Sequence, residues 1–178
     1  MKNVKTAIII MLVVIFGSST ISGVSAMNKM ADKVTDYFYN GDGKYTNQSI
    51  YSDIVDKSEI AKNLVNLSKN YVSGNDSHVK AISKDANDIT AEKSVKKLYQ
   101  LTSDLDANVL WLITELGNTA LNPTDSEMLV KYQSQYRSET NTINSSDYNT
   151  LVRPSNEEVS GIPGSLFKWF THKVEAFE

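Results

Sequence analysis

The 178-residue sequence contains no cysteine, and this absence excludes several kinds of chemistry at once. A chain without thiols forms no disulfide, no thiolate zinc site and no cysteine-ligated iron–sulfur cluster, and it has no cysteine nucleophile. Histidine, the commonest general base, occurs only as His78 and His172. Neither has a carboxylate at a metal-binding spacing such as H-E-x-x-H. The sequence therefore predicts no catalytic residue, no metal site and no cofactor.

Proline and arginine are also scarce. All three prolines, Pro123, Pro154 and Pro163, lie in the last third of the chain, so long helices can form before them. The two arginines are Arg137 and Arg153, and the formal net charge is −3. Because nucleic-acid binding depends on clustered Lys and Arg side chains that face phosphates, we expect no nucleic-acid partner.

The start of the chain differs from the rest in composition. Two lysines precede an apolar run at residues 7–16, and no charged residue follows until Lys29. A basic start, a short apolar core and the small residues that end at Ala26 are typical of a secretory signal peptide cleaved after Ala26. The alternative is an uncleaved anchor, in which later apolar residues lengthen the run toward the roughly 20 that a full span needs.

We therefore expect residues 1–26 to be a membrane anchor or signal segment that contacts lipid through residues 7–26. The predicted localisation is that of a single-pass membrane protein of a bacterial cell envelope, with one transmembrane helix. Secretion after cleavage near Ala26 is the alternative. The sequence leaves open which side of a membrane the rest of the chain would face.

Apolar residues recur at helical spacing through the remainder of the chain. Shorter patterns cover residues 45–72, 77–87 and 124–143. The clearest pattern predicts one helix over residues 90–121, roughly 45–50 Å long at about 1.5 Å per residue. Its apolar positions step by three or four residues: Leu98, Leu101, Leu105, Val109, Leu112 and Leu116.

A helix of that length cannot bury its apolar stripe alone and needs antiparallel partners of similar length. The sequence therefore predicts an all-α fold. Residues 27–178 are expected to form an up-and-down antiparallel helical bundle with long, coiled-coil-like helices, preceded by the one N-terminal hydrophobic helix. We also expect a turn at residues 41–44, which contain two glycines, and a linker after Pro154 that leads to an apolar, aromatic tail at residues 166–177.

Three stretches, in order along the chain, carry motifs: residues 63–71 contain N-L-V-x-x-x-K-x-Y, residues 148–156 contain Y-N-x-x-V-R-x-x-N, and the apolar ending at residues 162–178 closes on Ala-Phe-Glu. Together these stretches resemble segments of the LemA family. The resemblance implies a helical bundle behind a single membrane segment. It implies no catalytic activity that could be assigned to named residues.

The sequence also departs from the family pattern. Family members carry an A-W-S-x-I-D-V-Q-L-K-R-R stretch before the N-L-V motif, whereas residues 45–58 contain no tryptophan and no basic pair. Pro154 stands where the family helix continues, and we expect it to break or kink that helix. The chain therefore resembles a divergent member of the family.

Carboxylate pairs are the remaining candidates for acid–base chemistry. Asp104 and Asp106 are two positions apart, and Glu157 and Glu158 are adjacent. On a helix such neighbours point in different directions. We therefore interpret both pairs as solvated faces rather than as acid–base pairs.

Other charged residues are interpreted as ordinary surface. Asp53 and Lys57, four positions apart on a predicted helix, are expected to form a surface ion pair. The densest basic cluster, at residues 93–97, is interpreted as a solvated helix start. The aromatic and basic residues at 166–173 are consistent with a lipid interface or with covering the open end of the bundle, and we favour the second interpretation.

Two kinds of function remain open. The first is a non-catalytic, membrane-associated bundle that binds another protein of the cell envelope or serves as a scaffold. The alternative is an exported small-ligand binder or enzyme with a site inside the bundle. That alternative requires ionisable residues on the apolar stripes, and the stripes identified above consist of Leu, Ile, Val and Tyr. We therefore expect a protein partner, of unknown identity, and no enzymatic activity.

Overall fold

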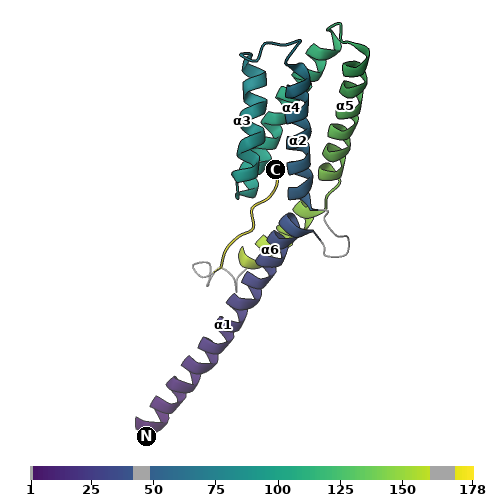
Figure 1. Ribbon diagram of the computed structural model, residues 1–178. Coiled ribbons are helices and arrows are strands. Elements are labelled where there is room, and N and C mark those ends of the chain that lie inside the picture. Colours follow the sequence, from purple (N-terminus) through teal and green to yellow (C-terminus); the bar gives the residue numbers. More distant parts are fainter. Residues whose placement is uncertain (1, 42–48, 161–170) are drawn as a thin grey trace. The chain divides into compact units, whose positions relative to one another are not determined.

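The computed structural model describes residues 2–41, 49–160 and 171–178, and the regular elements within these ranges are all α-helices (Figure 1). No strand occurs in them, so the all-α prediction is confirmed. The helices are α1 (Lys2–Asn40), α2 (Ile50–Ser68), α3 (Ser77–Ala91), α4 (Val95–Gly117), α5 (Pro123–Asn144) and α6 (Tyr148–Ser160).

The chain divides into two compact units. The first, here called the terminal unit, consists of Met1–Asp36 and Thr150–Val174. The second, here called the bundle unit, consists of Tyr37–Asn149 and Glu175–Glu178. The predicted division into residues 1–26 and 27–178 stays a prediction.

The bundle unit is a packed helix bundle built around α2. This helix packs against α3, α4 and α5, and α3 also packs against α4, whereas contacts between α4 and α5 are sparse. Five of the six apolar positions predicted for α4 are buried in the core, whereas Leu101 is half-buried and lines a groove between α3 and α4. The fully buried members of the core on α2, α3 and α4 are Ile54, Ala61, Leu64, Ile82, Ala86, Ile89, Leu98, Leu105, Leu112 and Leu116.

Residues 90–121 do not form the single helix that their periodicity predicts. The structure ends α3 at Ala91 and begins α4 at Val95, so α4 is 23 residues long, or about 35 Å. Polar side chains make the break. The Glu92 carboxylate accepts hydrogen bonds from two backbone N–H groups at 2.8 Å, and the Ser94 hydroxyl accepts one from the Lys97 N–H at 3.3 Å. These acceptors satisfy donors that a helix start leaves free.

Two other boundaries follow from local chemistry. Gly41 ends α1 with a positive φ of 75°, and its N–H donates to the Tyr37 carbonyl at 3.0 Å. The expected turn is therefore present at its first residue, and residues 42–44 lie outside the described ranges. Asn122 caps α5, because its side-chain oxygen accepts the Asp125 N–H at 2.9 Å, and Pro123 occupies the first helical position.

Pro154 was expected to break or kink its helix; the break is wrong, because α6 continues through it to Ser160, and the kink stays a prediction. A proline inside a helix removes one N–H donor and crowds the preceding turn, at a cost of about 3 kcal/mol. Hydrogen bonds beyond the proline help to offset this cost. Asn156 donates to the Val174 carbonyl and accepts from the Val174 N–H, both at 2.9 Å, within the terminal unit.

The single-pass membrane prediction is contradicted. Within the described ranges, no helix combines the length and the apolar character that crossing a bilayer requires. The helix α1 is 39 residues long, but its uninterrupted apolar run ends at residue 16 and is followed by Gly17 and three hydroxyl residues. That run is shorter than the roughly 20 apolar residues of a full span. Contact of residues 7–26 with lipid and cleavage after Ala26 stay predictions.

Leu105 and Leu110 offer a matched test of the core, because both lie on α4 and differ in burial. Leu105 is fully buried, and Leu110 is 66% exposed. Leu105→Ala should lower the free energy of unfolding by about 2–5 kcal/mol, since it removes buried methyl groups and leaves a cavity. Leu110→Ala should change it by less than about 0.5 kcal/mol. Urea unfolding followed by circular dichroism measures both, and equal losses would contradict the packing described.

Candidate functional site

An open groove runs along the bundle unit where α4 and α5 make few contacts. We call it the α4–α5 seam. It has a volume of about 280 Å³. Leu110, on its α4 side, is 66% exposed, and Val130, three positions before the lining residue Gln133 on α5, is 64% exposed. The lining residues are Asp106, Val109, Leu110, Ile113, Gln133, Tyr136, Arg137 and Thr140.

A charged network lies at the bottom of the seam. The Lys57 side chain, from α2, is 2% exposed, and its Nζ lies 2.6 Å and 2.9 Å from the two carboxylate oxygens of Asp106 on α4. The Tyr136 hydroxyl, from α5, donates to Asp106 at 2.7 Å, and Lys57 Nζ lies 4.9 Å from the centre of the Tyr136 ring. The network therefore links three helices through one carboxylate.

The chemistry open to this network is limited by its internal pairing. Burial raises the pKa of the Tyr136 hydroxyl, and the adjacent Asp106 carboxylate raises it further, so Tyr136 stays neutral and donates a hydrogen bond. A catalytic lysine acts as a free amine, whereas Lys57 Nζ donates to a carboxylate. The arrangement is that of a satisfied polar network whose rim reaches solvent through Asp106, which keeps 38% side-chain exposure.

The expected surface pair between Asp53 and Lys57 is wrong. Lys57 is 1% exposed, and its partner is Asp106 on another helix. The signal in the sequence is that Lys57 falls on the buried stripe of α2, between Ile54 and Ala61. A lysine at such a position needs a carboxylate from a neighbouring helix.

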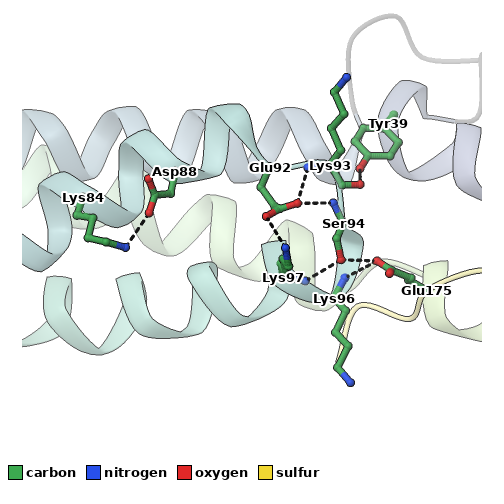
Figure 2. Close-up of polar contacts among 9 residues, drawn as sticks. All are labelled: Tyr39, Lys84, Asp88, Glu92, Lys93, Ser94, Lys96, Lys97 and Glu175. Carbon is green, nitrogen blue, oxygen red and sulfur yellow. Dashed lines mark hydrogen bonds and ion pairs between the residues drawn. The ribbon is translucent and has the colours of Figure 1, made fainter.

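Asp104 and Asp106 diverge, as their spacing predicts. Asp106 lies in the α4–α5 seam, whereas Asp104 lines a separate groove of about 430 Å³ between α3 and α4. Figure 2 shows the polar contacts of Asp88, Glu92 and Lys97, three of the residues that line this second groove. Charged neighbours pair with one another there, since Lys84 lies 2.7 Å from Asp88 and Lys97 lies 3.6 Å from Glu92. The three lysines at residues 93–97 are exposed, which confirms the solvated helix start.

Three acidic side chains lie near one another on α2 and α5. Asp53 is 9% exposed. Burial raises the pKa of Asp53 to about 6, and the negative charges of Glu139 and Asp56 add to the shift. Burial and Asp56 also raise the pKa of Glu139. Asp53 and Glu139 therefore favour the protonated state more than exposed carboxylates do.

The two histidines lie in different units. The ring of His78 stacks on Trp111 with centroids 4.3 Å apart, and its Nδ1 lies 2.7 Å from the Asn108 side-chain oxygen. His172, in the terminal unit, has its Nε2 3.2 Å from an Asp32 carboxylate oxygen. Among the described residues, no group of three or more His, Cys, Asp or Glu side chains is arranged to hold a metal ion.

The remaining predicted surface residues are described only in part. Glu157 pairs with Arg153 at 3.0 Å in the terminal unit, as expected of a solvated face, and nothing is described of the Glu158 side chain. The aromatic residues at 166–170 lie outside the described ranges. Phe177 is described, and its ring contacts those of Phe38 and Tyr99 in the bundle unit.

Two of the stretches that resemble the LemA family meet in the bundle unit. The Tyr148 hydroxyl donates to the Glu175 carbonyl at 2.6 Å, and Asn149 bonds both backbone groups of Phe177. Comparison of the chain with protein-family models, curated proteins and solved structures found no match. The resemblance therefore stays a prediction that rests on these residues.

The two members of the buried ion pair differ in exposure, so their removal should differ in effect. Asp106→Asn leaves the ammonium of Lys57 buried without a carboxylate and should lower the free energy of unfolding by about 3 kcal/mol. Lys57→Met leaves a carboxylate that keeps 38% side-chain exposure and the Tyr136 donor, and should lower it by about 1 kcal/mol or less. Urea unfolding at neutral pH gives both values. The reverse order would contradict the assigned burial.

The raised pKa of Asp53 predicts a pH dependence of stability. A carboxyl whose folded pKa, about 6, exceeds its unfolded value of about 3.9 stabilises the fold fully below pH ~4, and this contribution is lost as the pH rises through 6. Between pH 4 and 7, the free energy of unfolding of the wild type should fall by about 2 kcal/mol relative to that of Asp53→Asn. Chemical unfolding at several pH values measures this, with Glu59→Gln, an exposed change on α2, as control. A difference that does not vary with pH would contradict the shift.

Proposed function

We propose that this chain is a non-catalytic interaction protein whose α4–α5 seam binds an amphipathic helix of a partner protein. The observation that carries the proposal is the 66% exposure of Leu110 in the lining of a groove that two helices of the bundle leave open. Val130, which is 64% exposed, lies on α5 three positions before the lining residue Gln133. Large apolar side chains gathered at a groove are typical of a protein-binding surface. A groove between helices is typical of sites that accept a further helix.

We infer that α2–α5 form an up-and-down bundle with one incomplete edge. Short connections join successive helices, and α2 packs against the other three, which supports an antiparallel order. In a complete bundle of this type the first and last helices and each successive pair are packed together. The sparse contact between α4 and α5 therefore means that one helix–helix interface of the bundle is incomplete. A helix from a partner protein would pack into this gap.

The lining of the seam specifies the chemistry of that helix. Leu110 and Ile113 on α4 offer apolar contacts, so the partner needs apolar side chains at i, i+3 or i+4, and i+7. Arg137 is exposed on the α5 side. A carboxylate on the rim of the partner helix would pair with it in a geometry that favours bidentate hydrogen bonds.

The LemA resemblance enters as a second part of the proposal. We propose that the chain is a divergent member of that family. Support comes from the three ordered stretches and from the contacts that Tyr148 and Asn149 make with the end of the chain. The resemblance to that family implies no catalytic residues in this chain, which agrees with an interaction or scaffold role.

The alternative function, a small-ligand binder or enzyme with a site inside the bundle, is favoured by one observation. Lys57, Asp106 and Tyr136 are ionisable residues at buried positions, which that alternative requires. Their hydrogen bonds are made to one another, and a ligand would have to displace them. We therefore favour the structural role for the network and the binding role for the apolar part of the seam.

Site-specific photo-crosslinking in the native host tests the seam as a docking surface. A photoreactive residue would replace Leu110, Val130 or Gln100, one at a time; Gln100 is exposed on the α3 side of α4 and serves as control. Positions 110 and 130 should capture the same segment of one partner, with amphipathic helical spacing and a carboxylate, and position 100 should not. Leu110→Glu should reduce capture at position 130 about tenfold, whereas Gln100→Glu should leave it unchanged. Equal capture at 100 and 110, or none at 110 and 130, would contradict the proposal.

A further inference from the structure

The bundle unit already binds one extended segment of its own chain, at Glu175–Glu178. Residues Glu175–Glu178 have no helical or strand structure, and three different kinds of contact hold them. One is to the peptide backbone, one is to a carboxylate and one is to an aromatic ring. Each of these contacts involves side chains or backbone groups of the bundle unit.

Asn149 recognises the backbone. Its side-chain amide donates to the Phe177 carbonyl at 2.8 Å, and its side-chain oxygen accepts the Phe177 N–H at 2.9 Å. The Tyr148 hydroxyl donates to the Glu175 carbonyl at 2.6 Å. In the terminal unit, Asn156 makes the same pair of bonds to Val174. Such bonds are available from any extended peptide, so they give affinity without choosing a sequence.

The Glu175 side chain supplies the first element of sequence recognition. Its carboxylate accepts the Ser94 hydroxyl at 2.7 Å and the Lys96 N–H at 3.1 Å, at the beginning of α4 (Figure 2). The Ser94 hydroxyl and then the Lys96 N–H lower the pKa of Glu175, so the carboxylate is the favoured form. A neutral amide at this position could not satisfy two donors as well.

The ring of Phe177 supplies the second element. It meets the Tyr99 ring edge-on with centroids 5.2 Å apart, and it lies 5.7 Å from the Phe38 ring. A cavity of about 130 Å³ remains beside it, lined in part by Ile143 and Tyr148. The phenyl ring therefore does not fill the space that its surroundings offer.

We propose that this part of the bundle unit is a recognition site for an extended segment of a partner protein with the pattern Glu-x-aromatic, and that residues 175–177 occupy it in cis. The backbone clamp, the two donors to the carboxylate and the aromatic surroundings each recognise a different feature of the segment. Because the phenyl ring leaves space beside it, a partner with Trp or Tyr at the third position displaces the chain's own end. This site is separate from the seam and does not depend on it.

Peptide binding to the full-length chain tests the proposal. The probes are labelled acetyl-Glu-Ala-Phe-Glu, the same peptide with Trp for Phe, and a scrambled control. Phe177→Ala removes the ring of the internal competitor, so it should bind the Phe peptide about tenfold more tightly than wild type does. The Trp peptide should bind more tightly than the Phe peptide, by about threefold or more. Asn149→Ala in the Phe177→Ala background should weaken binding about tenfold, and Asn141→Ala, an exposed change on α5, should not.

Circular dichroism establishes that each variant keeps its helices. If Phe177→Ala loses its helices, Glu175→Gln is used instead. This variant weakens the hydrogen bonds that hold the same segment and keeps the Phe177 side chain. The proposal is overturned if neither peptide binds the folded variant at about 1 mM, if the scrambled peptide binds equally well, or if Asn149→Ala leaves the affinity unchanged. Equal affinity of wild type and the loosened variant would also overturn it, because the internal segment would then not occupy the site.

Discussion

The buried lysine of α2 sets the geometry of the bundle around it. Lys57 lies on an apolar stripe and is 1% exposed, so its ammonium must have a carboxylate close by. Asp106 on α4 supplies one, and Tyr136 on α5 donates to the same group. An ion pair sealed from water on both sides would carry a larger desolvation penalty. The 38% side-chain exposure of Asp106 reduces that penalty and fits a bundle in which α4 and α5 do not close over it.

The open edge and the charged network are therefore two aspects of one arrangement. Leu110 stays exposed in the open seam, and the network at its bottom connects α2, α4 and α5 without closing it. A second surface, at the beginnings of α4 and α6, holds Glu175 and Phe177 through Ser94, Tyr148 and Asn149. We propose that the first surface binds a helix and the second an extended segment of other chains.

Periodicity predicted most of the bundle core but not the way its helices end. The stripe from Leu98 to Leu116 is buried as expected except at Leu101, because burial repeats with the helical period. The break between α3 and α4 was missed, since it depends on hydrogen bonds from Glu92 and Ser94 to backbone groups. Helix continuation through Pro154 was also missed, because hydrogen bonds between Asn156 and Val174, far apart in sequence, help to hold that segment.

The candidate sites were less predictable than the fold, for the same reason. Sequence spacing assigned Lys57 to a surface pair with Asp53, because it cannot show which neighbouring helix supplies a carboxylate. It identified Tyr148, Asn149 and the final Ala-Phe-Glu as similar to segments of one family, but not that they contact each other. The apolar run near the N-terminus was interpreted as a transmembrane helix, and no helix in the described ranges meets that requirement.

Solvent paramagnetic relaxation of leucine and valine methyl groups tests the open seam most directly. A soluble paramagnetic agent relaxes methyl protons according to their distance from solvent, and Leu105 and Leu110 on the same helix provide an internal comparison. The account predicts strong relaxation at Leu110 and Val130 and little at Leu105, because the first two are 66% and 64% exposed and the third is fully buried. If Leu110 and Val130 are as protected as Leu105, then α4 and α5 close on each other in solution and the seam does not exist.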